Sequence, residues 1–398
     1  APISGTSDVG PGRTVTLTIT DANGDKVTVT AVTDANGNYS TTADLGGLAD
    51  GNLTVEASVT DAAGNRADAR DDTTLLDTTA PVDLAIKLDD DITPDDVINA
   101  AEAGQQIPVS GRVGGDVQVG DTVTLTVNGK TFTGQVLADK TFSIKVPGAD
   151  LVTDGDKVIY ASVTTTDAAG NSTTATGSEG YSVDTQGPSV VVNIVDPQII
   201  AGETSDVTFT FSEQVTGFEL GDLTVVGGTV TGLTTTDGGK TWTATFTPDA
   251  NFTGTASVTV KENSYTDLAG NKGTGGSDSA DTDTQGPSVL VNIVDSQIIA
   301  GETSPVTFTF SEQVTGFDLS DLDVVGGSVS NLTTADGGKT WSATFTPDAN
   351  FTGTASVTVK PESYTDLAGN KGTGGSDSAA TDTQGPSVLV NIVDSQII

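Results

Sequence analysis

The sequence DVTFTF at residues 206–211 decides the fold of this chain. Its apolar residues alternate with polar ones, the period of two that places apolar side chains on one face of a half-buried β-strand. The same alternation recurs in TWTATF at 241–246 and in TASVTV at 255–260, and turns rich in Gly, Asn and Asp separate the runs. No segment shows a convincing helical period. The chain is therefore predicted to be all-β.

These strands belong to a unit that occurs twice. Residues 184–282 are repeated at 283–381 with few differences, and another copy begins at Asp382 with DTQGPSVLVNIVDSQII. A unit of this size can hold its own hydrophobic core, unlike a solenoid repeat of ~20 to 45 residues. The boundary signature Asp-Thr-x-x-Pro also occurs upstream, as DTTAP at Asp77. The predicted domains are 1–76, 77–183, 184–282 and 283–381, with the first strand of a further repeat at 382–398.

Each unit contains about seven short strands in ~100 residues, which is typical of an immunoglobulin-like sandwich of two sheets. The chain has no cysteine, so the core must suffice without a disulfide. Trp242 and its copy Trp341 are predicted to be core residues. Asn128-Gly129 is expected to form a hairpin turn. The expected fold is a tandem array of immunoglobulin-like β-sandwich domains.

The charge of the chain excludes several partners. It carries 54 acidic and 16 basic residues, a net charge of −38 at pH 7. Such a chain repels nucleic acid and anionic membrane surfaces. No run of ~18 apolar residues is present, so direct membrane insertion is not expected. We expect neither nucleic acid nor a membrane as a partner.

Missing residue types restrict the chemistry. Without cysteine or histidine, the chain lacks a thiol nucleophile, the commonest general base and the commonest transition-metal ligand. No nucleophile and base, and no catalytic carboxylate pair, can be singled out from the acids in turns, so we predict that the chain is not an enzyme. The absence of methionine and the ends that fall inside repeats indicate an internal piece of a longer chain, with its secretion signal and anchor elsewhere.

Acidic residues recur at three places in the units. One is the boundary motif, another is the turn TDAAGN or TDLAGN, and the third is the turn SEQVTGF. If each of seven strands reverses direction, these three places lie at one end of a sandwich. Oxygen ligands that converge there suit Ca²⁺, which takes six to eight of them. The candidate ligands are Asp77, Asp167, Asn171, Asp184, Glu213, Asp267, Asn271, Asp283, Glu312, Asp366 and Asn370.

The turn between the first and second strands lies at the opposite end of each unit and would face the next junction. It carries Glu102, Glu203 and Glu302, which are candidates to complete the calcium shell. The alternative is that Asp and Asn in turns only bond their own backbone, as they do in most proteins. Recurrence at three places on one end favours calcium.

At these residues the chain resembles the extender region of very large bacterial surface adhesins of the RTX and biofilm-associated type. The resemblance covers all four units and rests on DTTAP at Asp77, TDAAGN at Asp61 and Asp167, VINAAEAG at Val97, and FSEQVTGF with DLAGN in the last two units. It implies tandem Ig-like domains, stiffened by calcium between them, that hold an adhesive tip away from the outer membrane after type I secretion. The last two linkers depart from the commoner form, since they read DTQGP.

The leading hypothesis is therefore a calcium-rigidified extender, or spacer, of a bacterial cell-surface adhesin that serves cell attachment or biofilm formation. It is expected to be extracellular and anchored in the outer membrane, with neighbouring repeats of the same chain as its partners. The alternative is a structural subunit of an extracellular filament, sheath or surface layer. This alternative is based on residues Ser387 to Val393, which are expected to form a lone first strand that could associate with a second chain. A third alternative is a module that binds sugar or ice.

Overall fold

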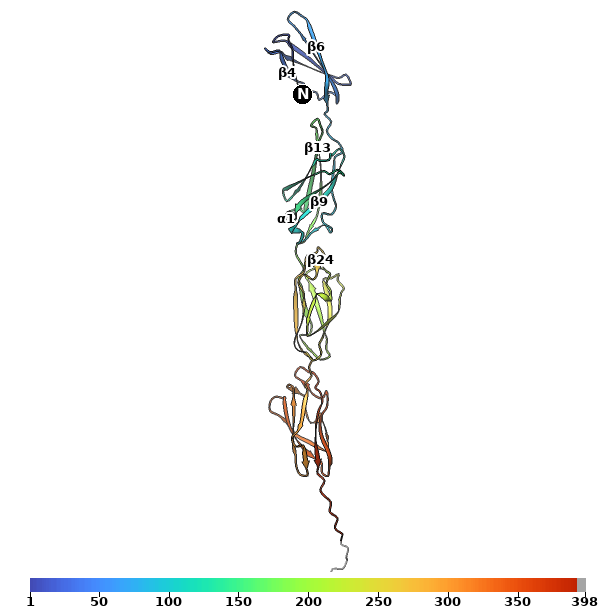
Figure 1. Ribbon diagram of the computed structural model, residues 1–398, viewed down its shortest axis with the longest axis vertical. Helices are drawn as coiled ribbons and strands as arrows, with labels where there is room; N and C mark the ends of the chain where they lie inside the picture. The colour runs from blue at the N-terminus through green and yellow to red at the C-terminus, as the bar shows by residue number, and fades with distance from the viewer. Residues whose placement is uncertain (392–398) are drawn as a thin grey trace, which may run out of the picture. The chain divides into compact units, whose positions relative to one another are not determined.

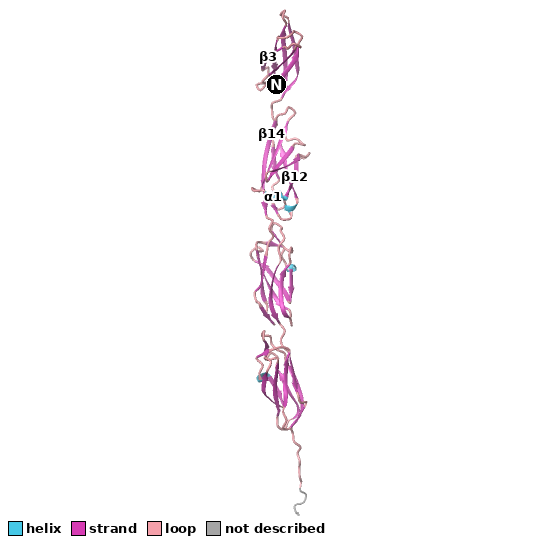
Figure 2. Ribbon diagram, turned by 90° about the vertical axis from the view of Figure 1, so that its left-hand side faces the viewer, coloured by secondary structure: helices cyan, strands magenta, loops and turns pink. Residues whose placement is uncertain are grey.

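The computed structural model describes residues 1–391, and strands make up nearly all of their regular structure (Figures 1 and 2). The chain divides into two compact units, residues 1–185 and 186–398. Each unit contains sandwiches of short strands, so the prediction of an all-β array of Ig-like sandwiches is confirmed. No helix in residues 1–391 is long and apolar enough to cross a membrane.

Residues 1–76 form a four-stranded sheet in the order β3-β2-β5-β6 and a two-stranded sheet of β1 and β4. The alternation of Thr with Val, Leu and Ile in β2 places every second side chain in the core. The strands are β1 (Pro2–Thr6), β2 (Thr14–Thr20), β3 (Lys26–Val32), β4 (Asn38–Thr42), β5 (Gly51–Thr60) and β6 (Arg66–Leu76).

Residues 77–183 form sheets in the orders β11-β10-β13-β14 and β12-β9-β7, with a short parallel pair of β15 and β8. The predicted hairpin is present, because Val127 pairs with Lys130 across Asn128 and Gly129, which have φ values of 49° and 69°. The elements are β7 (Ala85–Leu88), β8 (Val97–Ile98), η1 (Glu102–Gly104), β9 (Gln106–Gly114), β10 (Thr122–Val127), β11 (Lys130–Gln135), β12 (Thr141–Pro147), α1 (Gly148–Thr153), β13 (Val158–Thr166), β14 (Ser172–Gly180) and β15 (Ser182–Val183).

The repeat at 184–282 has sheets in the orders β16-β18-β22-β21 and β17-β25-β23-β20, with a small pair of β19 and β24. The elements are β16 (Val190–Ile194), β17 (Gln198–Ile200), β18 (Ser205–Phe211), β19 (Val215–Thr216), η2 (Leu220–Asp222), β20 (Leu223–Val226), β21 (Gly228–Thr235), β22 (Thr241–Pro248), β23 (Thr253–Val260), β24 (Thr266–Asp267) and β25 (Gly276–Asp283).

The repeat at 283–381 copies this arrangement strand for strand, with sheets β26-β28-β32-β31 and β27-β35-β33-β30 and a pair of β29 and β34. The elements are β26 (Val289–Ile293), β27 (Gln297–Ile299), β28 (Ser304–Phe310), β29 (Val314–Thr315), η3 (Leu319–Asp321), β30 (Leu322–Val325), β31 (Gly327–Thr334), β32 (Thr340–Pro347), β33 (Thr352–Val359), β34 (Thr365–Asp366) and β35 (Gly375–Asp382).

The first strand of each of the last two repeats is divided between the two sheets. In the repeat at 283–381, β26 pairs antiparallel with β28 in one sheet, and β27 pairs parallel with the end of β35 in the other. The repeat at 184–282 does the same with β16 and β17. In these two repeats one stretch of chain therefore holds both layers of the sandwich together. In residues 77–183, β7 joins the sheet of β9, whereas β8 forms a separate short parallel pair with β15.

Aromatic side chains close the core of the repeat at 283–381. The ring of Phe317 lies 5.2 Å from that of Phe308, 5.0 Å from Phe310, 5.5 Å from Trp341 and 5.9 Å from Tyr364, all in edge-to-face geometry. Trp341 is partly buried and packs against this core, as the sequence predicts for it and for Trp242.

The expected lone strand at Ser387 to Val393 is only partly covered by the structure. Residues 387–391 form no strand, and no β-partner is assigned to them. Residues 392 and 393, which the prediction includes, lie outside the described residues.

Replacing Phe317 by Ala should lower the free energy of unfolding of its domain by about 3–5 kcal/mol, because it removes a ring at the centre of a closed aromatic cluster. Calorimetry measures this effect. Leu290, which is 69% exposed in the same domain, is the matched control, and Leu290→Ala should change stability by less than about 0.5 kcal/mol. Equal effects of the two substitutions would contradict this account of the core.

Candidate metal centre

The turn TDLAGN builds a rigid carboxylate at the end of the repeat at 283–381. Oδ1 of Asp366 accepts the backbone N–H groups of Gly369 and Asn370 at 2.6 and 2.8 Å, and its Oδ2 accepts the Asn370 side-chain amide at 2.8 Å. These bonds are the ones expected of an Asp in a tight turn. Asp366 is 1% exposed and Asn370 is 2% exposed, so the turn is fixed inside the protein.

Two more carboxylates come from separate segments. Asp283 is the last residue of β25, the final strand of the preceding repeat, and its Oδ1 accepts the Thr253 hydroxyl at 2.9 Å. Glu312 lies in the SEQVTGF turn between β28 and β29. The carboxylate oxygens of Asp283, Glu312 and Asp366 lie within 4.8 Å of one another. This acidic triad therefore joins the last strand of one repeat to two turns of the next.

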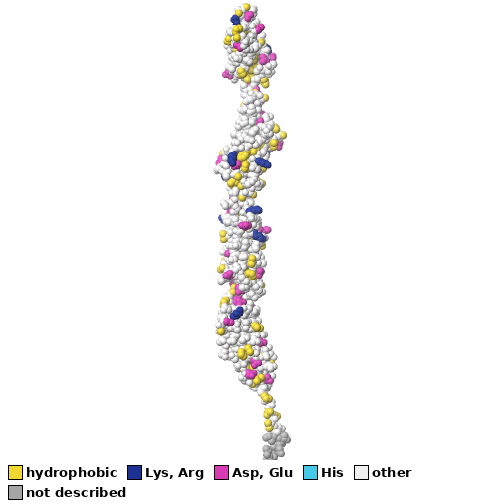
Figure 3. All heavy atoms as spheres, turned by 60° about the vertical axis from the view of Figure 1, so that its left-hand side comes forward, with side chains coloured by type: hydrophobic (Ala, Val, Ile, Leu, Met, Phe, Trp, Pro, Cys, Tyr) yellow, Lys and Arg dark blue, Asp and Glu magenta, His cyan; other side chains and the backbone are white. Residues whose placement is uncertain are grey.

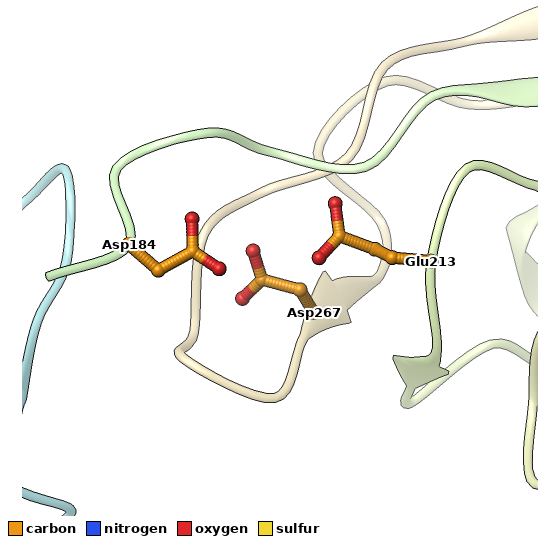
Figure 4. Close-up of side chains that lie close together, drawn as sticks. All are labelled: Asp184, Glu213 and Asp267. Atoms are coloured by element: carbon orange, nitrogen blue, oxygen red, sulfur yellow. The ribbon is translucent and has the colours of Figure 1, made fainter. Parts of the chain in front are cut away.

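The equivalent positions of the copy at 184–282 are Asp184, Glu213 and Asp267. Their carboxylates lie within the same distance, and Figure 4 shows them pointing toward one another. Three predicted ligands of each copy thus converge, as the parity of the strands predicts. Their role as ligands stays a prediction.

The charges of the triad act on Glu312. Burial, followed by the negative charges of Asp366 and Asp283, raises the pKa of the Glu312 carboxyl above its ordinary value of 4.5. Like charges at this distance repel one another, so three ionised carboxylates disfavour the folded state unless a cation lies among them. The visible face in Figure 3 shows acidic side chains scattered over the surface.

The free energy of unfolding measured in chelator should fall as the pH rises from about 4.5 to neutrality. A carboxyl whose pKa is raised in the folded state contributes stability below its unfolded pKa and loses it as the pH rises through the folded value. The pKa of Asp336 is lowered from 3.8 to about 2, chiefly by the Thr340 backbone N–H. Its contribution to the free energy of unfolding therefore rises with pH, but only in the acid range below the one in which Glu312 acts. Glu312→Gln should reduce this slope in thermal melts. An unchanged slope would show that Glu312 does not carry the effect.

Asn370 contacts the preceding repeat directly. Its Oδ1 accepts the backbone N–H of Ala201 at 2.8 Å, and its Nδ2 donates to the Asp283 carbonyl at 2.9 Å. Ala201 follows β17 in the turn between the first and second strands, which is the turn predicted to face the next junction. The Asn370 side chain therefore braces two repeats, and its predicted role as a metal ligand stays a prediction.

Asn370→Ala should destabilise the repeat at 283–381 by about 1–3 kcal/mol, because it removes the side-chain partner of the Ala201 N–H, of the Asp283 carbonyl and of the buried Asp366 carboxylate. Calorimetry of the full chain, which follows the unfolding of every domain, measures the effect. Asn65 makes the same bonds to Asp61 but is exposed, so Asn65→Ala is the matched control and should cost no more than about 0.5 kcal/mol. Indistinguishable effects would contradict the bracing role.

The corresponding residues of the second domain form a smaller group. Asp167 has the same turn bonds to Asn171, and the Asn171 side-chain amide donates to the Asp77 carbonyl at 3.0 Å. The turn after its second strand carries Asp116 instead of Glu, and that carboxylate accepts the Val82 N–H at 2.9 Å. Asp77 and Asp167 are therefore not part of a carboxylate triad of the kind found in the later repeats.

Glu102, Glu203 and Glu302 cap their own turns. Their Oε2 atoms accept the N–H groups of Asn99, Ile200 and Ile299 at 3.1, 3.2 and 3.2 Å. None belongs to the acidic groups found in the described residues. Their completion of a calcium shell stays a prediction.

The donor set of the triad fits calcium. It consists of hard carboxylate oxygens in a chain without cysteine or histidine, and such oxygens are the ligands that Ca²⁺ takes. A sulfur- or nitrogen-rich site for zinc or copper cannot be built from these residues.

Two residues of this junction escape sequence reasoning. Ala201 contributes a backbone N–H, which leaves no signal in the side-chain pattern. Tyr364 fixes the linker, because its hydroxyl donates to the Thr373 carbonyl at 2.7 Å and lies 3.3 Å from the Pro287 carbonyl. Burial raises the pKa of Tyr364 to about 12, so the donor proton is retained. A tyrosine occurs at this position in both repeats, and that recurrence could have indicated its role in fixing the linker.

Residues 184–282 and 283–394 match a family model described as a bacterial Ig-like domain, and residues 4–78 match a second model with the same description. The chain belongs to the bacterial Ig-like domain family. Bacterial Ig-like domains of this kind are structural adhesin repeats without enzymatic activity, in agreement with the prediction from the sequence.

The chain is similar to a solved structure described as a Ca²⁺-stabilized adhesin that helps an Antarctic bacterium reach out and bind ice. The two are 32% identical over 96% of this chain and 94% of that one, with a TM-score of 0.55. A structure from a 1.5-MDa bacterial ice-binding adhesin is 30% identical over 71% of this chain and 91% of its own, with a TM-score of 0.43. The predicted resemblance to large bacterial adhesins is confirmed.

A single bacterial immunoglobulin-like domain from the M. primoryensis ice-binding adhesin is 45% identical, over 27% of this chain and all of its own length, with a TM-score of 0.24. No curated protein matches the chain.

Proposed function

We propose that this chain is a calcium-stiffened extender of a bacterial cell-surface adhesin, which holds an adhesive part of the protein away from the cell. The observation that carries the proposal is the triad of Asp283, Glu312 and Asp366, which combines the last residue of one repeat with two turns of the next. The similar adhesin described as Ca²⁺-stabilized supports the same cofactor here.

The residues of the chain prepare this junction for a cation. Asp366 is held by three hydrogen bonds, Asp283 is fixed by its place at the end of β25, and Glu312 brings a third negative charge. A bound Ca²⁺ ion supplies positive charge to the three carboxylates and takes six to eight oxygen ligands in all. Repulsion between the carboxylates is then replaced by attraction to a common centre.

The rest of the junction offers little other restraint. In the described residues, no strand of the repeat at 184–282 shares a sheet with a strand of the repeat at 283–381. A hollow of about 380 Å³ separates the β17 and β25 strands from Leu367 and Ala368. Asn370 adds two side-chain hydrogen bonds across the repeats, to the Ala201 N–H and to the Asp283 carbonyl. Cation binding at the triad is therefore the main way to make this junction stiff.

The expected affinity for calcium indicates in which compartment the junction sites are filled. Extracellular calcium modules bind at roughly 10⁻⁴ to 10⁻³ M, so millimolar calcium outside the cell fills such sites and cytosolic calcium does not. We propose that the chain is exported by type I secretion in a flexible state, stiffens outside, is anchored at the outer membrane, and serves attachment or biofilm formation.

The division into domains at 1–76, 77–183, 184–282 and 283–381 is part of the same proposal.

Calcium should raise the thermal midpoint of the repeats that carry triads. At a concentration a hundredfold above the dissociation constant, one site adds about 2.7 kcal/mol to the free energy of unfolding. Glu213→Gln combined with Glu312→Gln should remove most of this gain and leave the midpoint in chelator equal or higher, since each substitution relieves repulsion. Calorimetry in calcium and in chelator measures both effects, and small-angle scattering of the same samples measures flexibility.

The matched control is Glu362→Gln. Glu362 is an exposed acid in the repeat at 283–381 that pairs with Lys371 at 2.9 Å, and exposed pairs contribute little. This variant should respond to calcium like the unmodified chain. If the double variant keeps the full calcium response, or if scattering is the same with and without calcium, the proposed function is wrong.

A further inference from the structure

The second domain presents an aromatic ring to solvent. The chain has 12 Phe, 5 Tyr and 2 Trp residues. Tyr160 of β13 is 50% exposed, whereas every other aromatic ring of residues 1–391 belongs to a hydrophobic core or packs against one. Tyr160 is therefore the one aromatic side chain in this part of the chain that is open to a ligand.

Tyr160 lies on a sheet face that carries hydroxyl groups and no charge. Across the sheet β11-β10-β13-β14 it pairs with Thr126 on one side and Ser178 on the other, and Ser162 and Thr176 form a pair in the next row. No residue of these four strands that shares this face is charged. In a chain with a net charge of −38, such a face is the place where an uncharged partner meets the least electrostatic cost.

The sheet does not need this surface in order to form. The sheet β3-β2-β5-β6 of the first domain has the same arrangement, and its β2 begins with the same sequence, TVTLT, as β10. The strand registers place Glu56 and Arg70 there at the positions of Tyr160 and Ser178. The uncharged face with its exposed ring is therefore a property of the second domain and not of the fold.

A hollow of about 560 Å³ lies beside the ring. It is lined by Tyr160, by Thr126 and Ser162 of the two central strands, and by Thr176 and Ser178 of the edge strand β14. This volume is in the range of sites that bind small molecules, about 300 to 1,000 Å³. The hollow therefore has room for a ligand of one or two rings.

The four hydroxyls of the hollow have no hydrogen bond to another side chain within the described residues. Farther along the same face the hydroxyls bond in pairs, Thr164 with Thr174 and Thr166 with Ser172, each at 2.8 Å. A hydroxyl both donates and accepts a hydrogen bond. The hollow therefore offers a set of uncharged donors and acceptors to a ligand.

Asp156 fixes the ring of Tyr160. The Tyr160 hydroxyl donates to Oδ2 of Asp156 at 3.1 Å, and Oδ1 of Asp156 accepts the Val158 backbone N–H at 3.2 Å. The hydrogen bond to Asp156, followed by the negative charge of that carboxylate, raises the pKa of the Tyr160 hydroxyl above its ordinary value of 10.0. The phenol is therefore neutral at physiological pH, and its orientation is set before a ligand arrives.

We propose that this hollow is a binding site for a neutral carbohydrate chain built of hexose units. The C–H groups on one side of a hexose ring carry partial positive charge and pack on the negatively polarised face of an aromatic ring. The sugar hydroxyls exchange hydrogen bonds with Thr126, Ser162, Thr176 and Ser178. An acidic sugar is disfavoured, because the negative charge of the chain repels it. The second domain then attaches to polysaccharide by itself, in addition to acting as a spacer.

The experiment is saturation-transfer NMR and calorimetric titration of the full chain with tetrasaccharides of glucose, mannose and N-acetylglucosamine. At least one of these neutral sugars should bind with a dissociation constant of about 1 mM or below. Tetragalacturonic acid, the acidic counterpart, should bind at least about tenfold more weakly. Because the hollow contains none of the triad carboxylates, binding is expected in calcium and in chelator alike.

Two substitutions at Tyr160 separate the ring from its hydroxyl. Tyr160→Ala should weaken binding at least about tenfold, and Tyr160→Phe, which keeps the ring, should stay within about threefold of the unmodified chain. Leu137→Ala is the matched control, since Leu137 is 51% exposed in the same domain and does not line the hollow. It should leave binding unchanged. Because both side chains are exposed, none of the three variants should shift the thermal midpoint of the domain.

The proposal is overturned if none of the neutral tetrasaccharides binds at millimolar concentration. It is also overturned if Tyr160→Ala and Leu137→Ala bind equally well, which would place the sugar elsewhere on the chain. Equal binding of tetragalacturonic acid would contradict selection by the uncharged face.

Discussion

The structure of each repeat depends on a first strand that hydrogen-bonds to both sheets. The β26 strand is antiparallel to β28, and only a few residues later β27 is parallel to β35. A sandwich without a disulfide relies on its core to hold two layers together, and this divided strand adds main-chain bonds to each layer.

The acidic turns have two roles that sequence alone does not separate. Asp366 and its counterparts bond their own backbone, as the simpler interpretation holds, and in two places they also meet carboxylates from other segments. The first role is common to Asp61, Asp167, Asp267 and Asp366, and it makes the turn. The second requires a glutamate after the second strand, which only the last two repeats have. A local motif therefore becomes a candidate ion site only when a distant residue completes it.

The sequence predicts the fold class, the hairpin at Asn128-Gly129 and the convergence of Asp283, Glu312 and Asp366, because alternation, turn chemistry and strand parity are local or countable properties. It does not predict the bond between Asn370 and Ala201, since a backbone N–H leaves no trace in a side-chain pattern.

The parallel pairing of β27 with β35 gives each repeat a defined response to force. The chain enters the repeat before β26 and leaves it after β35, so tension on the two ends pulls these parallel strands in opposite directions along their length. Their hydrogen bonds are then sheared together and must break together, instead of opening one at a time as in a peeled hairpin. The same few residues that close the sandwich therefore also set the force at which it opens.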